Sequence, residues 1–351
     1  MKERDITLFE RPLLNFSLLT TNRMALIAIG ALLVTAQSAL SDGGFSFVIA
    51  AASLLGAVSA EFLLSILRRK RFINDLSAAA SGLVLALMLP NAINPLLAFF
   101  AAFFSMAVVK GAFGGLGSNW INPAAAGFLF ARFSWEEAFN EALAESPITV
   151  YGSIETVSVT AEPFLERGLE AVVGFFNKTV FQIFSCEIPF SFTSFLASSS
   201  PDIIAGRGVL ALLVAGAVIL ANGRRIMLFS LYMVFYLSLV KIAGALGEGG
   251  GLNEGDMFYC LFSGGTLVAA FFLTADPASG PKSYGGKVFA VLLAAAFSFI
   301  FRYISGELYG AFFAVLLVNA LCPLIRDYET NKIYRCSCAA YGKKHDGRTF
   351  S

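Results

Sequence analysis

Long apolar runs separated by short polar segments dominate the pattern of hydrophobic and polar positions along this chain. A membrane-spanning helix needs about 20 apolar residues, and somewhat fewer where the helix is tilted or interrupted. By this measure the pattern predicts about ten transmembrane helices. They cover residues 24–40, 45–67, 76–90, 93–109, 121–133, 204–221, 226–246, 257–273, 288–303 and 308–325. The predicted fold class is an all-α polytopic membrane protein.

Three apolar segments depart from a simple spanning helix. Residues 76–90 and 121–133 are short, rich in small residues, and end or begin near a proline, so we interpret them as partial or broken helices. Residues 171–197 are apolar but contain Lys178, Glu187 and Pro189. We therefore expect that segment to be interfacial or re-entrant rather than spanning.

Composition supports the membrane class. The chain of 351 residues is 57% hydrophobic and 14% charged, whereas a soluble domain carries roughly 25% charged residues. A net charge of +1 gives no overall field that would attract nucleic acid. Residues 1–23 are polar and lack the apolar core of a cleavable signal, so the first helix is expected to stay in the protein.

The lysines and arginines predict the orientation, because they accumulate on the cytoplasmic side. With both termini in the cytoplasm, 19 of the 25 basic residues, including Lys110, fall in cytoplasmic segments. The outer segments then hold Arg132, Arg167, Lys178, Arg207 and Arg302. An eleventh span would place Arg224 and Arg225 outside, so we reject it. The long outer loop at 134–170 is acidic and holds eight glutamates and no lysine.

The two halves of the chain share a pattern that predicts an inverted repeat. Ser81 and Gly82 open the third span, and Ser263, Gly264 and Gly265 do the same in the eighth. These positions match in a division into two five-helix halves, and five is odd, so the second half would enter from the opposite side. Paired interrupted spans mark the central site in such folds, although a short match of small residues also arises by chance.

This division predicts five regions along the chain. They are a cytoplasmic N-terminal segment at 1–23, the first repeat at 24–133, an outer loop and interfacial segment at 134–203, the second repeat at 204–325, and a cytoplasmic tail at 326–351.

The glycine-rich stretch at 114–127 is the strongest candidate for a central site. Irregular backbone at membrane depth occurs only where it is buried in protein or lines a cavity. A helix that starts at Asn122-Pro123 would direct its free N–H groups toward whatever lies there. A tight membrane turn is the simpler alternative. We expect Gly115, Gly117 and Asn122 to help form a cavity.

Other groups are less informative. Ionisable residues inside spans are functional candidates. Glu61 could pair with the basic cluster at 68–71 or serve an ion path. The side chain of Lys241 can instead extend toward the membrane surface. Cys336 and Cys338 fall short of the about four ligands of a metal site, so no metal is expected. The sequence contains no P-loop and no dinucleotide fingerprint.

Three separated stretches resemble one family in order and spacing. They are residues 114–124, with Gly115, Gly117, Asn119 and Asn122, residues 271–277, with Asp276, and residues 314–325, with Asn319. This pattern resembles the RnfD/NqrB membrane subunits of ion-translocating ferredoxin:NAD and NADH:quinone oxidoreductases. The resemblance extends over about residues 15–327, and the short tail is similar to the Rnf branch.

The resemblance implies a ten-helix subunit of inverted repeats, similar in architecture to ammonium and urea channels, in the bacterial inner (cytoplasmic) membrane. It would pass electrons through flavin and couple this flow to Na⁺ or H⁺ movement, together with the other membrane and peripheral subunits of its complex, and would not be catalytic alone. The stretches at 114–124, 271–277 and 314–325 would contribute to cofactor binding, with Asp276 and Asn319 approaching from the second half.

The resemblance also implies FMN attached through a phosphoester to a threonine in the loop after the fifth helix. The family's attachment motif is Ser/Thr-Gly-Ala-Thr, and here only Thr160 falls in place. Non-covalent riboflavin is the alternative cofactor. Two other functions stay open at this point: a small-solute transporter or channel with the same repeat fold and no redox chemistry, and a structural partner that has lost its cofactor.

Overall fold

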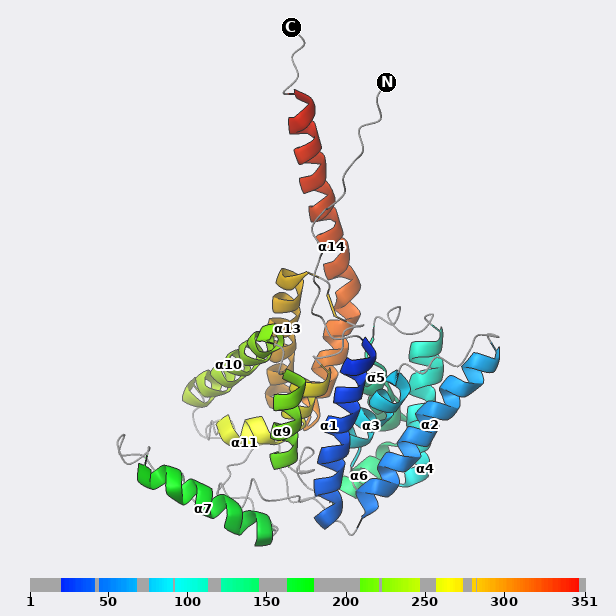
Figure 1. The fold of residues 1–351 in the computed structure, drawn as a ribbon, viewed down its shortest axis with the longest axis vertical. Coiled ribbons are helices and arrows are strands. Elements are labelled where there is room, and N and C mark those ends of the chain that lie inside the picture. Colours follow the sequence, from blue (N-terminus) through cyan, green and yellow to red (C-terminus); the bar gives the residue numbers. More distant parts are fainter. Residues whose placement is uncertain are drawn as a thin grey trace.

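The computed structural model describes residues 20–41, 44–67, 76–90, 92–112, 121–144, 163–179, 209–220, 223–246, 257–273, 280–281 and 283–346. Within these ranges every regular element is a helix, which confirms the all-α fold class (Figure 1). The first part comprises α1 (Thr20–Ser41), α2 (Phe45–Leu67), α3 (Ser77–Met88), α4 (Pro95–Phe104), the π-helix η1 (Ser105–Ala112), α5 (Pro123–Ser134), α6 (Glu136–Ala144) and α7 (Pro163–Thr179).

The second part comprises α9 (Val209–Leu220), α10 (Gly223–Leu246), α11 (Met257–Phe262), α12 (Thr266–Val268), the π-helix η3 (Ala269–Leu273), α13 (Tyr284–Phe299), the π-helix η4 (Ile300–Ile304) and α14 (Gly310–Asp346). Each apolar segment predicted from the sequence therefore contains helix. The element at 257–273 is broken, because α11 ends at Phe262 and α12 begins only at Thr266.

Among the described residues, six helices are long and apolar enough to cross a membrane. They are Asn22–Leu40, Phe45–Leu67, Pro95–Ala112, Arg225–Ala245, Tyr284–Ile304 and Gly310–Asn331. The structure thus confirms a multi-pass membrane protein, while the count of ten stays a prediction. The short lengths expected for 76–90 and 121–133 are confirmed, since α3 and α5 have 12 residues each.

Two asparagine–proline pairs fix the starts of α4 and α5. Asn122 Oδ1 accepts hydrogen bonds from the N–H groups of Ala124 and Ala125 at 2.9 and 3.3 Å, and Pro123 occupies the first turn. Asn94 caps α4 in the same way, accepting from Leu96 N at 2.9 Å. An asparagine cap satisfies N–H groups that have no partner inside the helix, and proline lacks the N–H that would be unsatisfied there. The predicted helix start at Asn122-Pro123 is therefore confirmed.

Close helix contacts at small residues build the bundle, as is usual where no hydrophobic effect drives helices together. A Cβ added to Gly56 on α2 would lie 2.2 Å from the carbonyl oxygen of Phe99 on α4. Across the two parts, α1 packs against α9, and Gln37 Oε1 accepts a hydrogen bond from Ala211 N at 2.7 Å. The Phe128 ring of α5 lies 5.0 Å from the Phe312 ring of α14.

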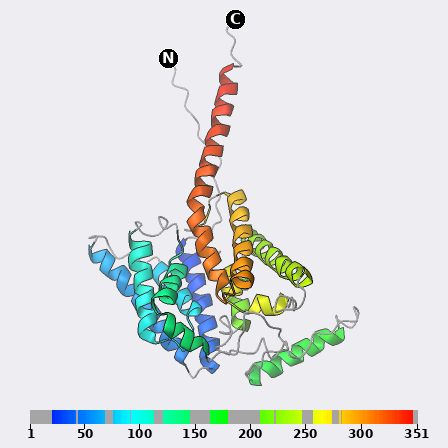
Figure 2. The same ribbon diagram turned by 180° about the vertical axis from the view of Figure 1, so that it is seen from behind.

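The start of α1 and the projecting end of α14 lie at the same end of the bundle, as both views show (Figures 1 and 2). The sequence predicts a separate tail from residue 326, but α14 continues through that boundary to Asp346. Its extension is anchored: Arg326 Nη2 donates to Gly280 O at 2.6 Å, and Ser283 Oγ donates to Glu329 Oε1 at 2.5 Å.

The opposite end of the bundle carries α7, which lies across the direction of α1 and α14 (Figures 1 and 2). Val172, Phe175 and Phe176 are exposed on it, next to charged residues such as Glu170. The region 134–170, predicted as an outer loop, contains α6 and the first turns of α7. The apolar pattern at 171–197 begins inside α7, an amphipathic helix of the kind found at membrane surfaces.

Candidate functional site

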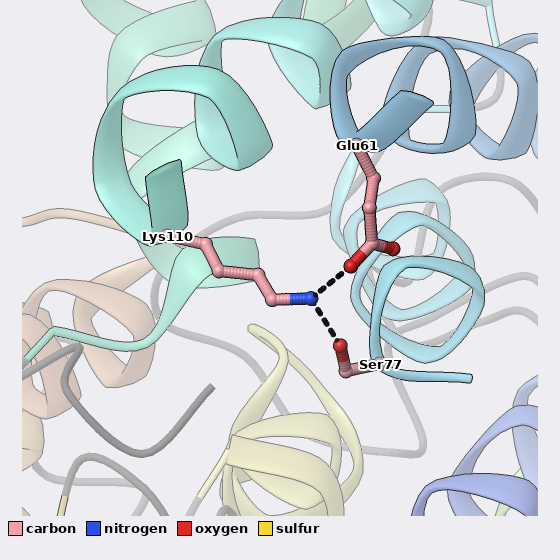
Figure 3. A network of polar contacts seen from close by, with 3 residues as sticks. All are labelled: Glu61, Ser77 and Lys110. Atoms are coloured by element: carbon pink, nitrogen blue, oxygen red, sulfur yellow. Dashed lines mark hydrogen bonds and ion pairs between the residues drawn. The ribbon is translucent and has the colours of Figure 1, made fainter. Parts of the chain in front are cut away.

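A buried ion pair joins three elements of the first half. Lys110 on η1 donates from Nζ to Glu61 Oε1 of α2 at 2.6 Å and to Ser77 Oγ at 2.5 Å, at the first residue of α3 (Figure 3). The Lys110 and Glu61 side chains are only 8% and 16% exposed. Charges withdrawn from water are costly unless they are paired and hydrogen-bonded, and this pair meets both conditions.

The π-helix η1 brings Lys110 to this position. The α-helical pattern of α4 ends at Phe104 and widens to π-helix from Ser105. Ser105 Oγ donates to Pro123 O at 2.7 Å, which ties η1 to the start of α5. π-Helical segments are rare and are frequent at functional sites. The structure therefore places a basic side chain where its own span departs from regular helix and contacts two neighbouring spans.

This arrangement corrects one expectation and adds a partner that the sequence did not indicate. Lys110 was counted among the cytoplasmic loop charges, but it is buried in the bundle. Glu61 was expected either to pair with the cluster at 68–71, which lies outside the described residues, or to serve an ion path. Its partner is Lys110, 49 residues further along the chain. No local sequence pattern indicates a partner at that separation.

A small cavity of about 40 Å³ adjoins the ion pair. Ser77, Ser81, Lys110 and Asn122 supply its polar lining, and Phe272 of η3 closes it from the second half. The other lining residues are Met24, Ile27, Ala80, Val84, Pro123 and Ala124. A cavity can hold a water once it offers about 10–15 Å³ and two to four polar partners, so this one has room for water. Ligand pockets of drug size measure about 300–1,000 Å³, so it does not accommodate a flavin ring system.

The structure describes two of the residues predicted to bind a cofactor. Asn122 lines the cavity, as expected for the glycine-rich stretch. Asn319 on α14 is 5% exposed, and its Nδ2 has no hydrogen-bond partner among the described residues, but Asn319 does not line this cavity. Gly115, Gly117, Asn119, Thr160 and Asp276 lie outside the described residues. Within the described ranges no three side chains of the metal-ligating types come together.

A second buried cation was not predicted from the sequence. Arg302 was counted among the outer charges, yet it lies in η4 with 2% exposure, and its guanidinium contacts the break between α11 and α12. A signal for it existed, because Arg302 falls inside the predicted span 288–303. Lysines and arginines inside spans are functional candidates in the same way as acids. With Lys110 and Arg302 set aside, the basic residues still divide 18 to 4, so the predicted orientation is unaffected.

Comparisons with known proteins agree on one family. A profile described as the NQR2, RnfD, RnfE family matches residues 9–335. The chain is 25% identical over 344 residues to the D subunit of the Na(+)-translocating ferredoxin:NAD(+) oxidoreductase complex of Acetobacterium woodii, covering 95% of this chain and 96% of the relative. It is 28% identical over 273 residues, 78% of each chain, to the D subunit of the proton-translocating ferredoxin:NAD(+) oxidoreductase complex of Clostridium ljungdahlii. It is 29% identical over 270 residues, 75% of each chain, to the D subunit of the ion-translocating oxidoreductase complex of Marinobacter nauticus.

Proposed function

The chain belongs to the NQR2, RnfD, RnfE family, and on this basis we propose that it is the RnfD-type subunit of an ion-translocating ferredoxin:NAD⁺ oxidoreductase complex. The observation that carries the proposal is the extent of the match, since the family profile covers residues 9–335. The relatives named above all hold this same place in their complexes, and they match this chain over three quarters of their own length or more. The chain acts as one subunit of a translocase in the cytoplasmic membrane, with the remaining Rnf subunits as its partners.

The proposal includes an architecture of ten spans in two inverted five-helix repeats. Two pairs of features support it. A residue with left-handed backbone precedes α3 and α12, namely Leu76 at φ 57° and Gly265 at φ 71°. The spans α4–η1 and α13–η4 both end in π-helix with a buried basic residue, Lys110 in one and Arg302 in the other. These spans are the fourth and the ninth, which are equivalent in a five-plus-five division.

The glycines of the matching sequence motif support the repeat less than the sequence pattern indicates, because they occupy different positions in the two halves. Gly82 lies in the middle of α3, where Ser53 Oγ donates to its carbonyl at 2.7 Å. Gly264 and Gly265 instead form the break before α12. The proposed orientation has both termini in the cytoplasm, and it is supported by the charge distribution and by the common end of the bundle at which α1 begins and α14 projects (Figure 1).

Coupling to ion movement is assigned in this proposal to the Lys110–Glu61 pair. The pair is an acid–base contact, 2.6 Å long, between two spans, and it adjoins a water-sized cavity. A cation or proton that reaches Glu61 neutralises the carboxylate and removes the main reason for Lys110 to stay beside it. Lys110 then keeps its hydrogen bond to Ser77 without the attraction of the acid. A change of charge at one residue thus alters the contact among η1, α2 and α3.

We further propose that this subunit carries FMN attached at Thr160, or non-covalent riboflavin, in accordance with the family resemblance. The cavity beside Lys110 is too small for the isoalloxazine, so the described residues do not form the complete flavin site and no electron-transfer step is derived through them. When bound, a flavin would accept and pass electrons, and the protein would supply position and environment.

Affinity purification tests the complex. The full-length chain, tagged at its C-terminus and isolated in mild detergent, should bring with it further Rnf-type subunits and a ferredoxin-dependent NAD⁺ reduction activity. Isolation of the chain alone, with all of that activity left in the untagged fraction, would contradict the proposal. A solute channel without redox chemistry would give that second result.

A further inference from the structure

The break in the eighth span exposes backbone oxygens inside the bundle. α11 ends at Phe262, and Gly264 and Gly265 take left-handed backbone at φ +67° and +71° before α12 begins at Thr266. Glycine adopts such angles without strain. The last carbonyl groups of any helix have no N–H partner within it and carry partial negative charge. The carbonyl oxygens of Cys260 and Ser263 therefore need hydrogen-bond donors from other residues, in a region that excludes water.

One guanidinium supplies those donors. Arg302 Nη1 donates to Ser263 O at 2.8 Å and to Cys260 O at 3.3 Å, and Nη2 donates to Ser263 Oγ. Thr266 Oγ1 also donates to both of these carbonyl oxygens, at 3.2 Å each. Three oxygen atoms of Cys260 and Ser263 thus accept hydrogen bonds from the end of a single cationic side chain, and Thr266 binds the two carbonyl oxygens among them.

Arg302 has an unusual charge environment for a buried arginine. It is 2% exposed, and none of the described carboxylates lies within ion-pair distance of it. The rings of Tyr259 and Tyr303 lie 5.9 Å from Cζ, at the range of a cation–π contact. Within the described part of the chain, carbonyl dipoles and aromatic faces therefore offset the positive charge, and no acid neutralises it.

The fit between the break and the guanidinium is close. A Cβ added to Gly264 would lie 2.5 Å from Arg302 Nη1 and 2.6 Å from Leu308 O. A Cβ on Gly310 would lie 2.8 Å from Arg302 N. Gly264 thus leaves space for the guanidinium, and Gly310 leaves space for the backbone of Arg302, so a side chain at either position would force a shift there.

We infer that the break between α11 and α12 is a cation-binding site whose permanent occupant is the guanidinium of Arg302. Carbonyl and hydroxyl oxygens at an unwound stretch of a membrane helix are the ligand type that takes alkali cations in transporters and channels. Here Cys260 O, Ser263 O and Ser263 Oγ form that set, and the tethered cation fills it.

The occupant cannot leave by losing its charge. Arginine is not deprotonated in proteins, and its planar fork suits several oxygens at once. The Lys110 ammonium differs, because a carboxylate that can itself be neutralised holds it. A fixed positive charge also repels free cations, as arginines do in selective pores. The break in the second half is thus closed to Na⁺, and any cation that crosses this subunit uses another route. This inference does not depend on flavin or on the identity of the complex.

Removal of the tethered cation tests the inference. The full-length chain with Arg302→Ala, in lipid nanodiscs, is heated in NaCl and in choline chloride at equal ionic strength. In choline its denaturation temperature should fall by about 10 °C from the wild-type value, because a buried set of partners is left unpaired. In NaCl it should recover by several degrees as Na⁺ enters the vacated site, and millimolar guanidinium chloride should give a similar recovery. The wild type should show neither response.

Arg132→Ala is the matched control. Arg132 also faces a ring, with Cζ 5.8 Å from the Phe139 centroid, and within the described part of the chain the Nε of both arginines has no hydrogen-bond partner. The charge of Arg132, however, pairs with Glu136 at 3.9 Å. It should show no preference for Na⁺ over choline. Equal denaturation temperatures of Arg302→Ala in the two salts, or the same Na⁺ response in Arg132→Ala, would overturn the inference. If Arg302→Ala does not accumulate, Arg302→Ser replaces it, and failure of both variants in sodium-containing medium also overturns it.

Discussion

Lys110 and Glu61 lie 49 residues apart in the sequence, and their side chains meet at 2.6 Å inside the bundle (Figure 3). Lys110 comes from the π-helix η1, and Glu61 comes from α2. Ser77 joins them from the start of α3. One ion pair therefore joins three helical elements, and its lysine lines the small cavity.

The ion pair should behave as a unit in substitution experiments. Lys110→Met leaves the Glu61 carboxylate buried without its partner, and Glu61→Gln leaves the ammonium in the same state, so each should cost about 3–5 kcal/mol. The double variant removes both charges and should be more stable than either single variant. Thermal denaturation of the purified protein measures this. Additive losses in the double variant would show that the two side chains do not interact.

The contact between α2 and α4 predicts a strong response at Gly56. Gly56→Ala places Cβ 2.2 Å from the Phe99 carbonyl oxygen, so the two helices must separate, and such overpacking costs about 1–3 kcal/mol. Gly174→Ala on α7 is the matched control, because nothing lies within 4 Å of its added Cβ. We expect the control to melt at or above the wild-type temperature. Equal melting temperatures for the two variants would contradict the described packing.

Topology follows from the charge distribution and from the shape of the bundle. Single cysteines that replace Glu137 or Glu141 on α6, both exposed, should react with a membrane-impermeant thiol reagent added to intact cells or spheroplasts. A cysteine that replaces the exposed Tyr328 on α14 should react only after the membrane is opened, as should the native Cys336 and Cys338. The reversed labelling pattern would refute the proposal that both termini are cytoplasmic.

Covalent flavin predicts a signal that survives denaturation. If FMN is attached at Thr160, the subunit should fluoresce as a yellow-green band in a denaturing gel under ultraviolet light, and Thr160→Ala should abolish the band. A phosphoester keeps the flavin in place when the fold is lost, whereas non-covalent riboflavin is released. A band that persists in Thr160→Ala would place the attachment at another residue.

Hydropathy predicted helix locations well, because apolar runs and asparagine–proline caps are local features. The predicted 45–67 matches α2 at both ends, and α5 begins directly after Asn122 as expected. π-Helix and the break after Phe262 were not predicted from periodicity, because both depend on donors from other spans. Arg302, for example, pairs with Ser263 O from a distance of 39 residues.

A smaller part of the candidate site than of the helix locations could be predicted from the sequence. Asn122 was assigned to a cavity from the glycine-rich stretch and does line one. The contact of Glu61 with Lys110 was not predicted, because the two residues are near in space and far apart in the sequence. The count of basic residues also placed Lys110 and Arg302 in segments outside the membrane. Both lie at the ends of predicted spans, and the end of a span is uncertain by a few residues when it is taken from hydropathy.

Membrane vesicles from cells without this gene test whether the chain is the RnfD-type subunit of an ion-translocating complex. The measurement is ferredoxin-dependent NAD⁺ reduction together with cation uptake into inverted vesicles, compared with vesicles from a strain that carries the gene on a plasmid. Both signals should be absent without the gene, because the complex lacks its RnfD-type subunit, and the plasmid should restore both together. Vesicles without the gene that retain full ferredoxin:NAD⁺ activity and cation uptake would contradict this assignment.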